Sequence, residues 1–432
     1  MINTSTRYNR GRCQREDFRD TAISSQPYKS IARLFCLAIL ATHVFFLWNV
    51  RGRIARGDPD FTAYYTAGRM LRSGQAAQIY DPATEFKVQK EFTVNNEIRK
   101  GPLRYIHPPF ETVLFLPLAF FSYRTAFVLW DLLNLGLVIA VCLISRTAQL
   151  AGADIRTWEL VLALLAFFPV FVNFFQGQDA ILLLLAVTLA FRAMHLRADF
   201  AAGCFLGAGL FRFHLVIPLV FILLLWGRGK VVAGFAAAAG GLFLISAAIL
   251  GWKATFAYPT YLWLWISVPG VGRPPASLLP SLFGLVSGWP GLERIQWLLR
   301  LAAFVASAGL LVLVARLKHV VNDPRFFDLG FACAILVSVL VGYNTSTYDL
   351  ALLVLPMFAV AQDLIHEQKG FRSLALPLLP LLVSPLWLLL GMRGQKFNLI
   401  AVLLLWWLFA VRKELLRRWP GGPQPEVVPP IG

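Results

Sequence analysis

The feature that most constrains this chain is a series of long apolar runs joined by short polar segments. The runs fall near 31–50, 109–121, 126–145, 157–174, 178–194, 200–226, 229–250, 295–316, 326–342, 348–364, 373–391 and 397–411. A transmembrane helix needs about 20 predominantly apolar residues. Because 58% of the 432 residues are hydrophobic and only 15% are charged, the apolar excess must face lipid. We therefore expect an all-α polytopic membrane protein with roughly 11–13 membrane helices.

The basic residues are distributed as loop charges rather than as a nucleic-acid patch. The net charge is +17, and Lys and Arg gather between apolar segments at 195–199, 226–230, 315–325 and 411–419. Cytoplasmic loops of membrane proteins carry this excess of positive charge. The pattern favours orientation signals and contacts with anionic headgroups over nucleic-acid binding. It predicts a multi-pass protein of the plasma (inner) membrane with cytoplasmic termini, in contact with membrane lipids and no nucleic acid.

The sequence predicts one membrane domain between two tails. Residues 1–29 are basic, and no small-residue cleavage site follows the first apolar run, so we expect a disordered cytoplasmic tail and an uncleaved first span. The membrane domain is expected at 30–416, with extracytoplasmic loops at 51–108 and 251–294, followed by a Pro-rich cytoplasmic tail at 417–432. The five cysteines are isolated, and no spacing indicates a zinc site or a disulfide framework.

Charge also predicts which polar clusters share one face of the membrane. We take the N-terminus as cytoplasmic and suppose that 200–226 is broken at 212–214, so that its first half rises and its second half returns. The basic runs then fall inside, and four polar clusters fall outside, at 58–60, 176–179, 212–214 and 344–349. This topology requires 109–121 to be re-entrant or incomplete. Nucleotide sugars and ATP are cytosolic, so chemistry on the outer face needs a donor that the lipid presents.

The segment DPDFTAYYTAG at 58–68 places two carboxylates just outside the first span. Asp58 and Asp60 flank a proline, and Asp is a good residue to cap a helix that Pro begins. One helical face, suited to lying along the membrane surface, then holds Phe61, Tyr64, Tyr65, Gly68 and Leu71. Spacing alone favours capping. A carboxylate here also suits a general base toward a sugar hydroxyl, and an Asp-x-Asp pair suits a divalent metal.

Two further clusters carry groups suited to phosphate or sugars. Tyr105 and His107 precede a Pro-Pro pair that begins the next helix, where a histidine binds phosphate or satisfies backbone groups equally well. Gln176 and Gln178 precede Asp179 between two apolar runs. Their amides suit hydrogen bonds to sugar hydroxyls, and the segment suits a polar turn with a helix cap equally well.

The last two clusters are Arg212-Phe213-His214 and the polar run at 344–349, which contains Tyr348. A charge at membrane depth is unfavourable unless it lines a cavity or has a partner, so Arg212 is a functional candidate. Arg212 beside His214 suits a departing phosphate, through charge-assisted hydrogen bonds. The alternative is a structural ion pair with an aspartate. The run at 344–349 is either a capped turn or part of a pocket.

These pieces, in this order, resemble family 87 glycosyltransferases, membrane enzymes related to polyprenyl-phosphate-mannose-dependent mannosyltransferases. The resemblance is carried by DFTAYYTAGRMLRSGQAAQIYDP at 60–82, YIHPPFETVLFLPLAF at 105–120, FFPVFVNFFQGQDAILLLL at 167–185, AGCFLGAGLFRFHLVIPLVFILLL at 202–225 and STYDLALLVLPM at 346–357. It implies a C-type glycosyltransferase fold with interfacial helices in the first extracytoplasmic loop. It also implies lipid-phosphate-linked sugar donors, matches Asp60 to the family's loop aspartate, and places Arg212 where the family often has Lys.

We expect Asp60 to be the catalytic base, with Asp58 as the second candidate. Asp60 deprotonates an acceptor hydroxyl, which attacks the anomeric carbon of a polyprenyl-phosphate sugar with inversion. Arg212 and His214, with His107, stabilise the departing lipid phosphate, and this requires Asp60 and Arg212 to face one cavity. The expected substrate-binding residues are Tyr64, Tyr65, Tyr105, His107, Gln176, Gln178, Arg212, His214 and Tyr348.

The donor is expected to carry a hexose or pentose, with mannose as the first expectation, and the acceptor is expected to be lipid- or glycan-linked. No cofactor is expected, and the sequence allows a divalent metal without requiring one. The alternative function is a lipid or sugar transporter or flippase that uses the same clusters for binding. Transporters typically show internal repeats and polar breaks in both halves, whereas this sequence has one clear midspan charge and no repeat, which favours the enzyme.

Overall fold

The computed structural model describes residues 10–93, 101–148, 155–267, 275–287, 292–367 and 396–420. Every regular element in these residues is helical, which confirms the predicted all-α class. The α-helices are α1 (Arg10–Ala55), α2 (Phe61–Arg72), α3 (Pro82–Lys90), α4 (Thr112–Phe115), α5 (Tyr123–Ala148), α6 (Thr157–Ala166), α7 (Phe168–Gln176), α8 (Ala180–His195), α9 (Asp199–Ala208), α10 (Phe213–Leu225), α11 (Gly229–Leu250), α12 (Trp252–Ser267), α13 (Leu282–Val286), α14 (Gln296–Ala315), α15 (Lys318–Val321), α16 (Pro324–Val341), α17 (Val354–Glu367) and α20 (Ile400–Arg418). The 3-10 segments that the site uses are η3 (Pro109–Glu111), η4 (Pro117–Phe120), η5 (Gly209–Arg212), η8 (Thr347–Leu353) and η9 (Phe397–Leu399).

Six helical stretches among the described residues are long and apolar enough to cross a membrane. They are Lys29–Ala55, Tyr123–Thr147, Asp199–Leu225, Gly229–Leu250, Gln296–Ala315 and Pro324–Val341. The pair α6 and α7, bent by 71°, adds a seventh if it is one span. The expected 11–13 helices counted every apolar run, but several runs fold as shorter helices, such as α8 with 16 residues. The run at 373–391 lies outside the described residues.

The stretch Asp199–Leu225 turns back on itself at η5. Arg228 Nη1 lies 3.8 Å from Asp199 Oδ2, so the two ends of the stretch are side by side. A straight helix of these 27 residues would instead separate its ends by about 40 Å. The predicted break at 212–214 is therefore present, and Arg212 lies at the tip of a re-entrant hairpin made of α9 and α10.

Glycines let this hairpin pack closely against α11. A Cβ atom added at Gly203 would lie 1.9 Å from the Val231 carbonyl oxygen, and one added at Gly234 would lie 2.0 Å from a backbone oxygen of α9. Gly207, just before the tip, lies against Ala238, near the middle of α11. The hairpin tip therefore ends part-way along the neighbouring span rather than at its end.

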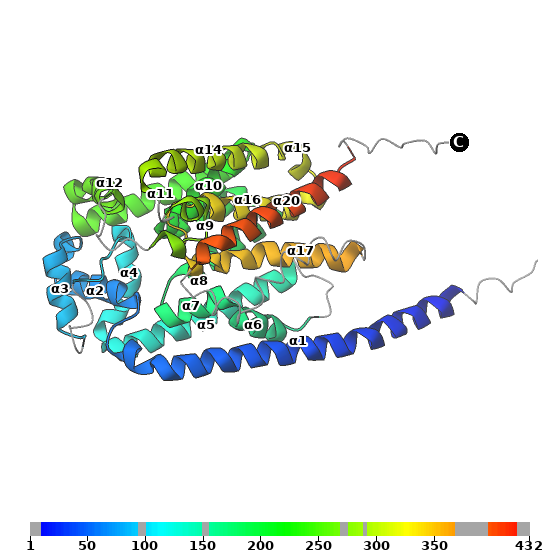
Figure 1. The fold of residues 1–432 in the computed structure, drawn as a ribbon, viewed down its shortest axis with the longest axis horizontal. Helices are drawn as coiled ribbons and strands as arrows, with labels where there is room; N and C mark the ends of the chain where they lie inside the picture. Colours follow the sequence, from blue (N-terminus) through cyan, green and yellow to red (C-terminus); the bar gives the residue numbers. More distant parts are fainter. Residues whose placement is uncertain are drawn as a thin grey trace, which may run out of the picture.

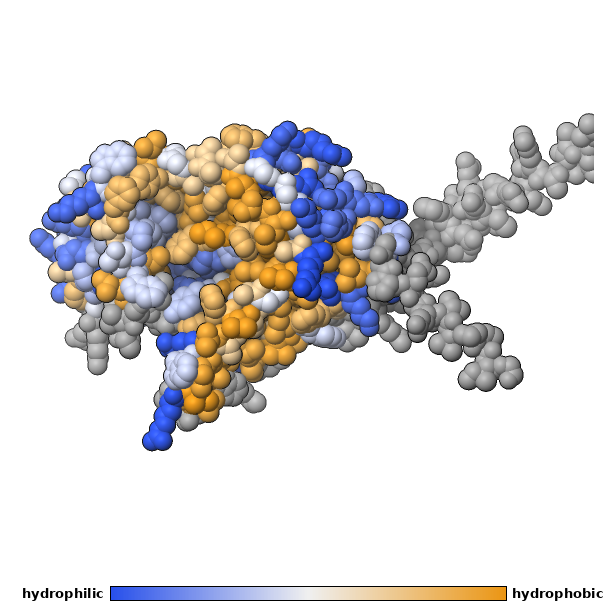
Figure 2. All heavy atoms as spheres, turned by 90° about the horizontal axis from the view of Figure 1, so that it is seen from above, coloured by the Kyte–Doolittle hydropathy of each residue, from blue (hydrophilic) through white to orange (hydrophobic). Residues whose placement is uncertain are grey.

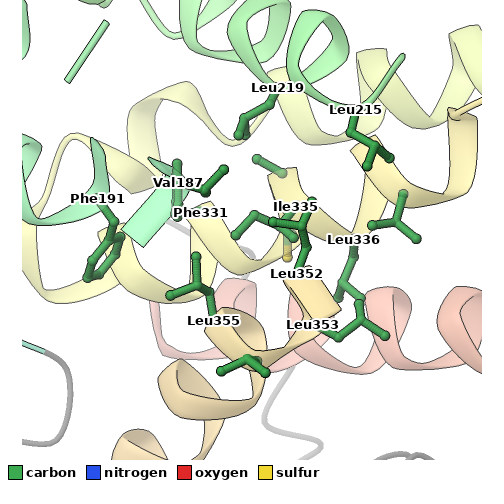
Figure 3. Packing of buried hydrophobic residues seen from close by; sticks show 14 of the residues in the cluster. Val187, Phe191, Leu215, Leu219, Phe331, Ile335, Leu336, Leu352, Leu353 and Leu355 are labelled. Carbon is green, nitrogen blue, oxygen red and sulfur yellow. The ribbon is translucent and has the colours of Figure 1, made fainter. Parts of the chain in front are cut away.

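The apolar core lies around α16. Its side chains are buried from Phe326 to Leu340 with the exception of Asp328, as expected for a helix surrounded by other helices. Figure 3 shows side chains of α8, α10, α16, η8 and α17 meeting there, namely Val187, Phe191, Leu215, Leu219, Phe331, Ile335, Leu336, Leu352, Leu353 and Leu355. Close van der Waals packing of this kind holds helices together in lipid, where apolar burial alone gives little net driving force.

The two ends of the helix bundle have different characters (Figure 1). The basic runs meet at one end, where Arg228 lies over the Phe327 ring and His195 Nε2 is 2.8 Å from Asp328 Oδ1. At the other end α2, α3 and α12 gather, and Tyr258 OH donates to the Ile106 carbonyl oxygen at 2.9 Å. The two loops expected on one face therefore touch. In Figure 2 an apolar belt separates two hydrophilic ends.

The structure can be compared with the predictions for two short segments, the run at 109–121 and the helix α2. The run at 109–121 folds as η3, α4 and η4, none of which is long enough to span, as the charge-based topology required. The helix α2 exists as expected, and nine of its 12 residues are buried against other parts of the protein rather than exposed on one face. The segment after η3 folds over it, so that a Cβ atom at Gly68 would lie 2.6 Å from the Phe115 carbonyl oxygen.

The expected tails are described only in part. The first helix begins at Arg10, so the tail expected to be disordered at 1–29 is helical from that residue onward. Residues 1–9 lie outside the described residues. So does 421–432, which is most of the expected C-terminal tail.

Candidate active site

A cavity of about 630 Å³ opens between α2, α7, α12 and η8. Its polar lining residues are Asp60, Tyr64, Arg104, His107, Gln176, Gln178, Asn344, Ser346, Thr347 and Tyr348. Its aromatic lining residues are Phe46, Phe168, Phe171, Phe175, Trp265 and Phe397. The cavity therefore combines hydrogen-bonding groups with an apolar wall, as ligand sites commonly do.

Asp60 is held in the cavity wall by two glutamine amides. Its side chain makes no cap hydrogen bond to α2, although spacing alone favoured capping. Instead, Gln178 Nε2 donates to Asp60 Oδ2 at 2.7 Å, and the Asp60 backbone N–H donates to Gln176 Oε1 at 3.2 Å. Asp58 does not line the cavity, and its Oδ2 pairs with Arg53 Nε at 2.9 Å. Of the two acids, Asp60 is therefore the one that a ligand can reach.

The turn between α7 and α8 brings both glutamines to Asp60. Gly177 ends α7 with φ +60°, a left-handed conformation that favours glycine. A Cβ atom there would lie 2.7 Å from the Phe61 Cβ atom, so a larger residue at this position would also collide with α2. Trp130 Nε1 donates to the Gly177 carbonyl oxygen at 3.0 Å and fixes the turn.

Arg212 lies behind Gln178 and does not line the cavity. Its side chain is 5% exposed, and Nε donates to Asp179 Oδ1 at 2.7 Å. Its Nη2 donates to Gln178 Oε1 and, at 3.2 Å, to Tyr64 OH. The condition that Asp60 and Arg212 face one cavity is not met. What the geometry shows for Arg212 is the alternative, an ion pair with an aspartate, together with support of the cavity wall.

The other side of Arg212 is closed by η8. Arg212 Nη1 is 3.4 Å from Asp349 Oδ1, and its guanidinium carbon is 4.9 Å from the centre of the Tyr348 ring. His214 Nε2 is 3.5 Å from Asp349 Oδ2, and His214 does not line the cavity. Tyr348 does, and burial raises its pKa to about 12, so its phenol is protonated and able to donate a hydrogen bond at neutral pH.

His107 faces the cavity as an uncharged ring. Its Nε2 is 3.1 Å from Tyr64 OH, and its Nδ1 is 2.8 Å from Glu111 Oε2. Burial lowers the pKa of His107 to about 3 and raises the pKa of Glu111 well above its usual range. A neutral histidine can exchange hydrogen bonds with a substrate, but it brings no positive charge to a phosphate.

Two expected ligand-binding tyrosines lie elsewhere. Tyr65 OH donates to the Phe121 carbonyl oxygen at 2.7 Å, and Tyr105 OH donates to the Pro108 carbonyl oxygen at 3.1 Å. Neither residue lines the cavity. Tyr64 does line it, and donates to Gln178 Oε1 at 2.8 Å. Successive residues of a helix point in different directions, which is why Tyr64 reaches the cavity and its neighbour Tyr65 does not.

Arg104 and Glu111 escaped the sequence-based prediction, and Asp179 was expected only as part of the polar cluster at 176–179. Arg104 is the one guanidinium among the described lining residues; its Nε is 2.9 Å from Glu85 Oε2, and its Nη2 contacts Tyr261 OH at 3.2 Å. Glu111 and Asp179 are fully buried behind His107. A carboxylate inside an apolar segment, four residues after a histidine, was a signal for Glu111.

Comparison with known proteins adds one match. The sequence model of glycosyltransferase family 87 matches residues 105–342, more than half of the chain. The matched part includes His107, Gln176, Gln178 and Arg212, whereas Asp60 precedes it. No curated protein and no solved structure matches the chain.

Proposed function

The chain belongs to glycosyltransferase family 87, a family of C-type membrane glycosyltransferases, and on that premise we propose that it uses a polyprenyl-phosphate sugar as donor. The acceptor is a hydroxyl of a lipid- or glycan-linked sugar, and mannose is the first donor sugar to test. The observation that carries the proposal is a single cavity with a carboxylate at its polar end and an aromatic wall beside it. Family membership favours a transferase over the transporter alternative.

The aromatic wall suits the lipid part of the donor. Phe46 comes from α1, Phe171 and Phe175 from α7, and Phe397 from η9, so helices of the membrane region supply it. A polyprenyl chain is wholly apolar and gains from contact with such a surface, at about 25 cal/mol for each Å² removed from water. A nucleotide sugar has no polyprenyl chain that would fill this wall.

Arg104 supplies the positive charge for the phosphate. It lines the same cavity as Asp60, whereas Arg212 does not. Charge-assisted hydrogen bonds from a guanidinium are well suited to a phosphate that gains charge as its bond to the sugar breaks. His107, three residues after Arg104, lines the same cavity and adds a neutral hydrogen-bonding group.

Asp60 acts as general base in this mechanism. It removes the proton of the acceptor hydroxyl, the oxygen forms a bond to the anomeric carbon, and the bond from that carbon to the phosphate oxygen breaks. The phosphate leaves with the electron pair as polyprenyl phosphate, and the configuration inverts. Gln178 orients the Asp60 carboxylate, and Arg212 orients Gln178.

We place the cavity on the extracytoplasmic side of the plasma (inner) membrane, with both termini in the cytoplasm. The support for this orientation is the gathering of basic loops at the opposite end of the bundle, where positive charge favours the cytoplasm. A donor on the outer face must come from the lipid phase, which agrees with the aromatic wall.

The test is sugar transfer by the purified full-length protein. A panel of polyprenyl-phosphate sugars is supplied with an acceptor, and released polyprenyl phosphate is measured. We expect Asp60→Asn to lower the rate by about 10²–10⁴-fold, and the matched Asp58→Asn to change it only a few-fold. A folded Asp60→Asn protein that works at the wild-type rate removes Asp60 from the role. If no lipid-linked donor releases polyprenyl phosphate but a nucleotide sugar transfers its sugar to the acceptor, the proposed donor class is overturned.

A further inference from the structure

We infer that His107, Glu111 and Asp179 form a binding site for one divalent transition-metal ion, directly behind the cavity wall. One ligand atom from each residue, a ring nitrogen and two carboxylate oxygens, lies within 4.8 Å of the others. Ligand bonds of about 2.0–2.2 Å put the donor atoms of a tetrahedral ion roughly 3.5 Å apart. Side-chain movements of about 1 Å would therefore close the site around an ion.

The carboxylate oxygens that meet here make no well-formed hydrogen bond in the described part of the chain. Both oxygens of Glu111 and Oδ2 of Asp179 are buried without a hydrogen bond from any described group. His107 Nδ1 lies 2.8 Å from Glu111 Oε2 and 3.9 Å from Asp179 Oδ2, and Glu111 also interacts with the Asp179 carboxyl group and the Tyr105 hydroxyl. Buried carboxylates without partners are strongly unfavourable, and a single cation at their meeting point would satisfy all of them.

The buried carboxylates around this point outnumber their positively charged partners, which favours the binding of a cation. Three buried carboxylates lie here, those of Glu111, Asp179 and Asp349, and the guanidinium of Arg212 is their one permanent positive partner in the described structure. When all three are ionised, two negative charges are in excess at low dielectric, and without a cation a proton on Glu111 must remove part of that excess. A divalent ion removes the excess. The competing arrangement is a proton shared by Glu111 and Asp179, whose carboxyl groups lie against each other.

Two of the three proposed ligands, His107 and Asp179, are already oriented by a second hydrogen bond, as metal ligands commonly are. His107 Nε2 contacts Tyr64 OH at 3.1 Å, and Asp179 Oδ1 accepts from Arg212 Nε at 2.7 Å. One imidazole with two carboxylates suits Zn²⁺ or Mn²⁺ better than Mg²⁺ or Ca²⁺, which prefer oxygen ligands alone.

An ion on His107 Nδ1 would set the direction of the hydrogen bonds that end at the base. It leaves the ring proton on Nε2, which then donates to Tyr64 OH. Tyr64 donates to Gln178 Oε1, and Gln178 Nε2 donates to Asp60 Oδ2. The ion is therefore a positioning element for Asp60, and it does not touch the substrate.

The experiment is metal analysis of full-length protein purified from cells supplied with zinc and manganese. We expect about one Zn²⁺ or Mn²⁺ per chain, removal by a strong chelator with a fall in melting temperature, and recovery when the metal alone is added back. Glu111→Gln should lose the ion. The matched variant Glu85→Gln, at another buried glutamate, should keep it.

Metal content and sugar transfer are separate readouts. Wild-type protein that transfers sugar with less than about a tenth of an ion per chain overturns the site and leaves the shared proton as the occupant. Full metal content in Glu111→Gln also overturns it. If no donor supports transfer but one ion per chain is bound, the metal site stands and the proposed donor fails.

Discussion

Gln178 is the residue on which the hydrogen bonds of the site converge. Its amide nitrogen donates to Asp60, its amide oxygen accepts from both Tyr64 and Arg212, and its backbone carbonyl accepts from Trp130 Nε1 at 3.3 Å. The side chain is nearly inaccessible to solvent. At the scale of single residues, the orientation of the candidate base therefore depends on one amide and on the guanidinium behind it.

The substitution Gln178→Met removes that amide and keeps nearly the same side-chain volume. Gln178→Met should lower the rate of sugar transfer by about 10²-fold, because small displacements of catalytic groups have effects of this size. We expect the melting temperature to fall modestly, since Tyr64 and Arg212 lose a shared acceptor. Gln78→Met, at an exposed position, is the matched control and should leave both quantities unchanged. Wild-type transfer by Gln178→Met would remove Gln178 from its positioning role.

At the scale of elements, the re-entrant hairpin decides where Arg212 lies. Its 27 residues are apolar enough for one complete span, yet the chain reverses at η5 and both ends of the stretch meet at Arg228 and Asp199. Arg212 and His214 make a straight crossing unfavourable, and at the tip they face the carboxylates of Asp179 and Asp349 instead.

The hairpin should be sensitive to side chains at its contact with α11. Gly203→Ala places a methyl group within 1.9 Å of the Val231 carbonyl oxygen, so the two helices must separate. We expect a loss of about 1–3 kcal/mol in unfolding free energy, seen as a lower melting temperature, and weaker sugar transfer because the tip moves. Gly240→Ala in α11 meets no atom within 4 Å and should be neutral or slightly stabilising. Equal stability of the two variants would contradict the close packing.

At the scale of the whole molecule, the two hydrophilic ends differ in content. One end holds α2, α12 and the cavity, and the other holds the basic loops around Arg197, Arg228 and Arg325. The extended α1 connects the two ends along one edge of the bundle (Figure 1). The orientation of this axis decides whether the cavity meets cytosolic or lipid-borne donors.

Cysteine labelling tests the proposed orientation. In a Cys13→Ser background, Gln78→Cys at the cavity end should react with a membrane-impermeant maleimide in intact cells. Arg197→Cys at the basic end should react only after the membrane is opened. Both positions are exposed, and the background chain reports labelling of the remaining cysteines. The opposite labelling pattern would place the cavity in the cytoplasm and contradict a lipid-presented donor.

The sequence by itself determined the helical membrane class, the incomplete run at 109–121, the break at 212–214 and the family resemblance. These follow from local properties, since the transfer of a segment into lipid depends on its own hydropathy and charge. Tyr64, His107, Gln176, Gln178 and Tyr348 were expected to bind substrate, and the structure brings them to the cavity with Asp60. Their roles remain predictions.

Only the tertiary structure decided which side chains face the cavity. It separated Asp60 from Asp58, turned Arg212 and His214 away from the cavity, placed Tyr65 and Tyr105 elsewhere, and brought in Arg104 and the buried acids. The reason is distance along the chain: Asp60 meets Gln178 across 118 residues, and Tyr64 meets Arg212 across 148. Hydropathy and spacing describe neighbours in sequence, and these contacts arise only when distant helices pack.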